Sequence, residues 1–162
     1  MAPKTSAAKP YRRGVGIALI NDRGQVLVAE RIDMPGAWQM PQGGIDKGET
    51  PRATAVRELH EEIGTNKARI IGVTRTWLRY DLPEELQRKS WGGKFRGQEQ
   101  KWFLMKFTGV DADIDLETHH PEFCAWKWMA FSQLPRVTVG FKRAIYKDVV
   151  KAFAAKVAAI KR

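Results

Sequence analysis

Three glutamates, Glu58, Glu61 and Glu62, follow a glycine-rich loop and lie close together in the chain. At about 100° per residue on a helix, they share one face. Carboxylates this close repel one another unless a cation lies among them, and Mg²⁺ typically binds a few carboxylates together with waters and substrate phosphates. The spacing therefore predicts a site for Mg²⁺, or for Mn²⁺ or another divalent cation, and attack by water on a phosphorus atom as its chemistry.

The helix that must carry these glutamates has recognisable limits. Thr50 can cap its N-terminus, Pro51 suits the first helical position, and Gly64 suits the left-handed residue after the last turn. The side of the helix away from the glutamates is apolar, which predicts a face that packs on the core. The residues expected on that face are Ala55, Val56, Leu59 and Ile63.

The stretch from Gly43 to Gly64, which also contains Glu49 and Arg57, resembles the Nudix box, the signature of hydrolases that cleave a nucleoside diphosphate linked to another group. Every fixed position matches except the last, where Thr65 replaces the usual aliphatic residue. A solvated helix face would explain the glutamates alone but not their coincidence with the other fixed positions. The resemblance implies a Nudix-type α/β/α sandwich with a mixed central β-sheet.

The rest of the chain alternates strand and helix patterns, which predicts an α/β fold with a mixed sheet flanked by helices. The expected strands are 15–20 and 25–30, joined as a hairpin, then 38–40, 68–80, 101–107 and 123–130. A polar loop is expected over 81–100, with one helical turn at 83–89, and a last helix over 141–159.

Segments outside the box narrow the resemblance to the Nudix subgroup that contains bacterial RNA 5′-pyrophosphohydrolases and plant-type diadenosine tetraphosphate hydrolases. The similarity runs from about Tyr11 to Phe153. It implies 5′-triphosphorylated RNA or a dinucleoside polyphosphate as the substrate. The segments that carry it are Tyr11-Arg12, 41–44, 77–80, 100–103, 121–123 and 141–143, together with the loop over 91–100. This loop is rich in glycine and charge and is expected to be functional, with Trp91 as a candidate to close a pocket around the second base of a dinucleotide.

The resemblance also implies roles for acidic and basic residues. Glu58, Glu61 and Glu62 match the family's metal ligands, and Arg57 matches an orienting residue paired with Glu49. Glu122 resembles an additional acidic residue that binds another metal ion or takes a proton from the attacking water. The general base stays open among Glu61, Glu62 and Glu122.

Substrate binding requires cations for phosphates and flat groups for a base. Phe141 is either a stacking residue or the first core residue of the last helix, and Tyr80 can donate its hydroxyl to a phosphate. The residues that match substrate-binding positions of the subgroup are Arg12, Arg31, Gln42, Tyr80, Lys101, Phe141 and Lys142.

Composition bounds the remaining expectations. The 162 residues predict a flexible tail over 1–10 and a single domain over 11–162. A net charge of +10 favours a polyanionic partner. The lone Cys124 excludes an internal disulfide and is expected to be a buried thiol, which fits a reducing, cytoplasmic compartment. The N-terminus has neither a signal peptide nor a membrane span, so no membrane partner is expected, and no oligomeric state is implied.

A non-catalytic RNA-binding or regulatory protein on the same scaffold is the competing class, because a fold alone does not fix a function. The complete set of box glutamates favours the enzyme, since a degenerate family member is expected to have lost some of them.

Overall fold

The structure is a computed structural model that describes residues 8–138 and 140–160. Residues 1–7 of the expected tail lie outside the described residues. Eight strands and three α-helices make up the described chain, together with four short 3₁₀ turns. The elements are β1 (Tyr11–Ile20), β2 (Gln25–Arg31), β3 (Trp38–Gln39), β4 (Gln42–Gly44), α1 (Pro51–Ile63), β5 (Ala68–Val73), β6 (Leu78–Asp81), α2 (Glu84–Lys89), β7 (Gly97–Phe107), β8 (Phe123–Ala130) and α3 (Arg143–Ile160).

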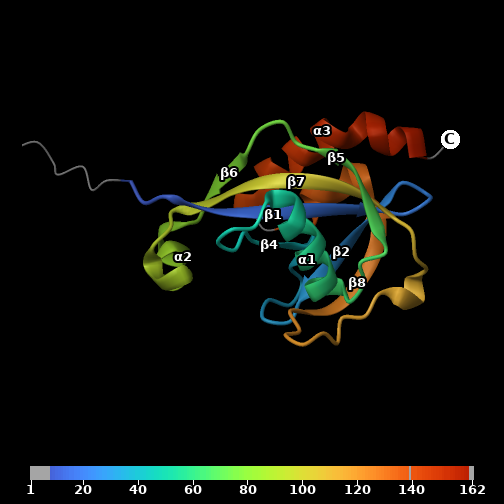
Figure 1. Ribbon diagram of the computed structural model, residues 1–162. Helices are drawn as coiled ribbons and strands as arrows, with labels where there is room; N and C mark the ends of the chain where they lie inside the picture. The colour runs from blue at the N-terminus through green and yellow to red at the C-terminus, as the bar shows by residue number, and fades with distance from the viewer. Residues whose placement is uncertain (1–7, 139, 161–162) are drawn as a thin grey trace, which may run out of the picture.

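The sheet is mixed, as predicted. Its main path runs β3-β2-β1-β7-β5, while β4 pairs with β1, β6 with β7 and β8 with β2. The β1–β7 pair is parallel, from Tyr11 opposite Gly97 to Ile20 opposite Lys106, and the other pairs are antiparallel. Figure 1 shows α1 and α3 on opposite faces of this sheet. The expected α/β sandwich with a mixed central sheet is therefore confirmed.

Two apolar clusters hold the helices to the sheet, because alternate residues of a strand point to opposite faces. Along β1, Val15, Ile17 and Leu19 belong to the cluster that includes Leu59 of α1. Ala18 and Ile20 belong to the cluster on the α3 side. The cluster around Leu59 packs α1 against one face of the sheet at β1, with the helix glutamates beside β4.

Helix α1 ends as predicted at both termini. The Thr50 side chain accepts a hydrogen bond from the Ala53 N–H at 3.1 Å, and Gly64 closes the helix in the left-handed region at φ 75°. Val56, however, is 45% exposed, so its expected place on the core face is wrong. The reason is that β4 covers the other flank of the helix, where Glu62 is buried. The buried side of α1 therefore lies closer to the glutamates than the helix periodicity predicts.

The expected strand over 68–80 is interrupted. Between β5 and β6, the Thr74 N–H donates to the Trp102 carbonyl, and the Thr74 hydroxyl accepts a hydrogen bond from the Trp102 N–H. These bonds hold Thr74 against β7 and separate the two strands. The expected loop over 81–100 contains α2, and its last residues, 97–100, belong to β7 and are buried. Polarity alone was misleading there because Gln98 finds a buried partner in the Tyr80 hydroxyl.

Cys124 is exposed, so its expected burial is wrong. Phe123 points into the core, and strand alternation turns Cys124 to the open side of β8. None of the helices in the described residues is long and apolar enough to cross a membrane.

Tyr146 fixes α3 to the segment that leads into β4. Its fully buried hydroxyl accepts a hydrogen bond from the Met40 N–H at 2.8 Å, and its ring meets Trp102 edge to face. Tyr146→Phe should lower the free energy of unfolding by about 1–3 kcal/mol, because it leaves a buried N–H without its acceptor. Urea unfolding measures this. Tyr11→Phe, which removes an exposed hydroxyl bonded to Asp81, is the matched control. An equal loss in both variants would contradict the anchoring role.

Candidate active site

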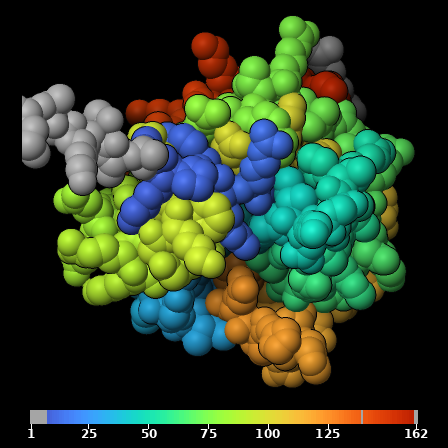
Figure 2. Space-filling model, turned by 60° about the vertical axis from the view of Figure 1, so that its left-hand side comes forward, coloured from blue at the N-terminus to red at the C-terminus, as the bar shows by residue number. Residues whose placement is uncertain are grey.

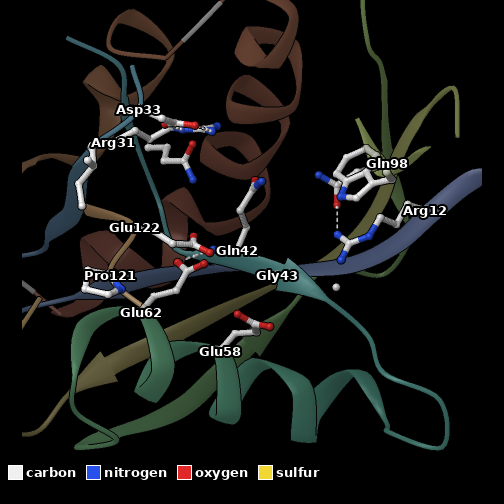
Figure 3. A pocket seen from close by; sticks show the side chains of 14 residues that line it. Arg12, Arg31, Asp33, Gln42, Gly43, Glu58, Glu62, Gln98, Pro121 and Glu122 are labelled. Carbon is white, nitrogen blue, oxygen red and sulfur yellow. Dashed lines mark hydrogen bonds and ion pairs between the residues drawn. The ribbon is translucent and has the colours of Figure 1, made fainter. Parts of the chain in front are cut away.

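A cleft of about 520 Å³ opens beside the start of β1. In Figure 2 it lies among the blue start of β1, the teal β4–α1 region and the orange segment before β8. Figure 3 shows Arg31 and Asp33 near Glu122 and Glu62, with Arg12 across the cavity from them. The lining residues predicted from the sequence are Arg12, Arg31, Gln42, Glu58, Glu62 and Glu122.

Two glycines of β4 allow side chains to come close to its backbone. A Cβ added at Gly43 would lie 2.0 Å from Cδ of Glu58, and one at Gly44 would lie 2.1 Å from Nη2 of Arg12. Neither contact is possible for a larger residue without movement of the charged group. The glycine pair therefore admits a carboxylate and a guanidinium to the same short strand.

Glu62 lies at the floor of the cleft and is 7% exposed. Its Oε2 accepts a hydrogen bond from the Gln42 N–H at 3.1 Å. Burial raises the pKa of Glu62 well above its usual range, and the charges of Glu122 and Glu58 raise it further. Figure 3 shows the Glu62 and Glu122 carboxylates pointing toward each other. This buried carboxylate thus lies among like charges.

Glu58 has a mixed environment. Burial raises its pKa, while the Arg57 guanidinium, 2.9 Å from Glu58 Oε1, opposes the rise. Glu61 is more open, with its side chain 56% exposed, and it accepts a hydrogen bond from the same Arg57 nitrogen at 3.0 Å. The three glutamates therefore differ in burial although they are neighbours on one helix.

Arg57 connects the loop to the helix. Its Nε and Nη2 donate to the two carboxylate oxygens of Glu49, each at 2.7 Å, and Nη2 also reaches the Gly44 carbonyl at 3.2 Å. This bidentate pair lowers the pKa of Glu49 to about 2. The contacts agree with the orienting role that the resemblance implies for Arg57.

The donor set fits a hard divalent cation. Across residues 8–138 and 140–160 no three His, Cys, Asp or Glu side chains form a ready-made metal cage. Mg²⁺ rarely requires one, because it keeps several waters and binds through one or two carboxylates and substrate phosphates. Burial raises the pKa of Glu62 most, and the charges of Glu122 and Glu58 add to the rise; a cation there would relieve this repulsion.

Two guanidiniums lie in the cleft, Arg12 on the far side from Glu122 and Arg31 near it. Arg12 donates to Gln98 Oε1 at 3.4 Å and lies over the Trp91 ring, 4.9 Å from its centroid. Arg31 is held by both oxygens of Asp33, at 2.6 and 2.8 Å.

Lys142 lies beside Gln39. It is buried, and its Nζ donates to Gln39 Oε1 at 3.3 Å. Burial lowers the pKa of Lys142 to about 8, and the Arg31 charge contributes to the decrease.

The remaining predicted substrate residues are more dispersed. Tyr80 is buried, and its hydroxyl accepts a hydrogen bond from Gln98 Nε2 at 2.6 Å. Phe141 is half-buried, packs on the α3-side core and lies 5.8 Å from the Tyr80 ring, centroid to centroid. Lys101 does not line the cleft: its Nζ donates to the carbonyls of Thr74 and Arg75.

Several lining residues were not anticipated from the sequence. They include Gln39 and Gln98, whose amides bond Lys142 and Arg12. Trp91, which lies under Arg12, belongs to the loop over 91–100 that the sequence predicts to be functional. Extending β7 back to Gly97 with strict alternation would have placed Gln98 on the same side as Trp102. No local pattern indicated Gln39.

Comparisons with known proteins agree with this geometry. The RNA pyrophosphohydrolase of Rhodospirillum rubrum is 60% identical over 148 residues, which covers 91% of this chain and 90% of the relative. The RNA pyrophosphohydrolase of Roseobacter denitrificans is 51% identical and covers 96% and 99% of the two chains.

Solved structures share the fold at lower identity. An Ap4A hydrolase of C. elegans in a binary complex has a TM-score of 0.69 at 21% identity and covers 91% of this chain and 98% of its own. The dihydroneopterin triphosphate pyrophosphohydrolase of E. coli has a TM-score of 0.66 at 22% identity, covering 89% of this chain and 100% of its own. Residues 10–149 match the NUDIX domain family model. The chain therefore belongs to the Nudix family, as the box from Gly43 to Gly64 indicated.

Proposed function

We propose that this protein is a divalent-cation-dependent pyrophosphohydrolase that removes pyrophosphate from the 5′-triphosphate end of RNA. The observation that carries the proposal is the convergence of Glu58, Glu62 and Glu122 in one cleft with two guanidiniums, that of Arg31 near Glu122 and that of Arg12 across the cavity. Carboxylates for a cation together with guanidiniums for phosphates are what hydrolysis of a polyphosphate requires. The relatives named RNA pyrophosphohydrolase support RNA as the substrate.

The chain's own residues divide the work. Arg12 and Arg31 hold the phosphates, and the buried Lys142 adds positive potential from behind Gln39. Glu58, Glu61, Glu62 and Glu122 would hold the cation, which when bound neutralises phosphate charge and acidifies a water. Glu122, exposed at the rim, is our candidate to accept the proton of the attacking water. Arg57 keeps the loop and helix in register.

The direct test is release of pyrophosphate from a 5′-triphosphorylated oligonucleotide with Mg²⁺, compared with the same reaction in EDTA. Turnover only with the cation is the expected result. Binding of the oligonucleotide without turnover under any divalent cation would instead identify a non-catalytic RNA-binding protein. We also propose a cytoplasmic location, which the lone cysteine favours.

A dinucleoside polyphosphate is the second candidate substrate. Trp91 lines the cleft on the Arg12 side and offers a flat surface for a second base. Paired kinetics on diadenosine tetraphosphate and on triphosphorylated RNA compare the two, and undetectable RNA turnover would make the dinucleotide the preferred substrate.

Glu62→Gln should lower kcat by about 100-fold or more, because the cleft loses an ionisable group next to the reacting phosphates. In EDTA the melting temperature should stay level or rise, since the substitution removes a buried like-charge repulsion. Added Mg²⁺ should raise the melting temperature of the wild type but not of the variant. Glu84→Gln, an exposed change on α2, is the control. Normal turnover in Glu62→Gln would reject the site.

The charge of Lys142 predicts a pH dependence. With its pKa lowered to about 8, the side chain is cationic below that pH and neutral above it. The value of kcat/KM, which reports the free enzyme, should therefore fall above a pH of about 8. Lys142→Arg should move this fall to higher pH because a guanidinium stays charged. An identical pH profile in the variant would show that Lys142 does not contribute.

A further inference from the structure

Beside the cleft lies a stack of cations and aromatic rings, which we call the basic ladder. Tyr11 lies between two guanidiniums, those of Arg79 at 4.9 Å and Arg96 at 4.8 Å from its ring centroid. Trp77 faces Arg13 at 4.8 Å and the Lys101 ammonium at 5.8 Å. The members of the basic ladder are Tyr11, Arg13, Trp77, Arg79, Arg96 and Lys101.

Two carboxylates hold the ladder in place. Glu99 accepts hydrogen bonds from Nε of Arg13 at 2.7 Å and from Nε of Arg79 at 3.0 Å. Asp81 accepts from the Tyr11 hydroxyl at 2.6 Å and from Arg96 at 2.8 Å. The register of β1, β6 and β7 brings these residues together, with Arg13 and Arg79 both opposite Glu99.

Arg13 and Arg79 face solvent more than the carboxylate that they share, whereas Arg96 and its partner Asp81 are both partly exposed, at 35% and 46%. The side chains of Arg13 and Arg79 are 65% and 60% exposed, whereas that of Glu99 is 9% exposed. The three arginines of the ladder share the two carboxylates Glu99 and Asp81, and the Lys101 ammonium donates to backbone carbonyls. A ligand approaching this face therefore meets positive charge and ring surfaces, with the compensating Glu99 hidden beneath them.

The ladder begins where the cleft ends. Arg12, which lines the cleft, stands between Tyr11 and Arg13 on β1, and alternation turns its neighbours to the other face of the strand. Figure 2 shows the blue start of β1 exposed at the rim of the cleft, beside the yellow-green region that contains β6 and α2. A single-stranded nucleic acid that leaves the cleft past Arg12 would meet the basic ladder next.

We propose that the basic ladder binds the nucleotides that follow the 5′-triphosphate of a single-stranded RNA, an inference that rests on the proposed function. Guanidiniums bind phosphates, and the outer faces of the Arg79 and Arg96 guanidiniums that cover Tyr11, together with the ring of Trp77, stack on bases without sequence preference. An acidic protein surface would use the cations but not the ring faces. Single-stranded RNA uses both.

The test separates long from short substrates. Arg13→Gln combined with Arg79→Gln removes two charges and two planar stacks, yet leaves amides to donate to Glu99. For a triphosphorylated oligonucleotide of about 12 nucleotides, KM should rise about tenfold with kcat unchanged, and the kinetics of a triphosphorylated dinucleotide should not change. Lys147→Gln combined with Lys151→Gln, exposed on α3, removes the same charge and should alter neither substrate.

A binding measurement separates failure of the ladder from failure of the proposed function. Fluorescence anisotropy with a 5′-hydroxyl oligonucleotide of the same length requires no turnover, and the arginine pair should still weaken binding about tenfold. Equal changes for long and short substrates, or binding of polyglutamate as tight as that of RNA, would overturn the proposal.

A second variant guards against loss of fold. Trp77→Ala should weaken long-RNA binding about tenfold, and Trp77→Phe should restore most of it, because a ring face remains. Two results would show that the basic ladder has only a structural role at the ends of β1, β6 and β7. One is unchanged binding in Trp77→Ala, and the other is a lowered melting temperature with no change in how binding depends on RNA length.

Discussion

The burial of the Glu62 carboxyl between Glu58 and Glu122 is the constraint on which the site depends. A buried carboxylate beside like charges is costly, and its raised pKa records that cost. The fold holds it there through the Gln42 N–H from β4 and through the packing of α1 against the sheet. Gly43 is part of the same arrangement, since a side chain at that position would occupy the space of the Glu58 carboxylate.

Arg57 balances part of that charge and explains why the glutamates are not equivalent. Its guanidinium contacts Glu49, Glu58 and Glu61 but has no hydrogen bond to Glu62 among the described residues. Glu58 and Glu61 therefore have a hydrogen-bonded positive partner, while Glu62 accepts a hydrogen bond from the Gln42 N–H and lies against the Glu122 carboxyl. The negative charge that Arg57 does not balance is therefore at the floor of the cleft, where Glu62 and Glu122 meet near Arg31.

The sequence predicted what is local and missed what depends on distant pairing. The caps of α1 were predictable because Thr50 and Gly64 act within one turn of the helix. The burial of 97–100 was not, because polar side chains become core residues only once Tyr80 and Gln42 satisfy them. Likewise, Val56 was misplaced because β4, not the helix periodicity, decides which flank of α1 is covered.

The parallel pairing of β1 with β7 also governs the order in which the chain can fold. Tyr11 pairs with Gly97, and β2 pairs with β8, which begins at Phe123. Most of the chain must therefore be synthesised before β1 and β2 can form these pairs. Non-local pairing of this kind slows folding, because loop closure precedes the contacts that reward it. During synthesis the apolar β1 strand therefore stays open to association with other chains, and we expect this enzyme to fold late on the ribosome and to depend on protection until β7 emerges.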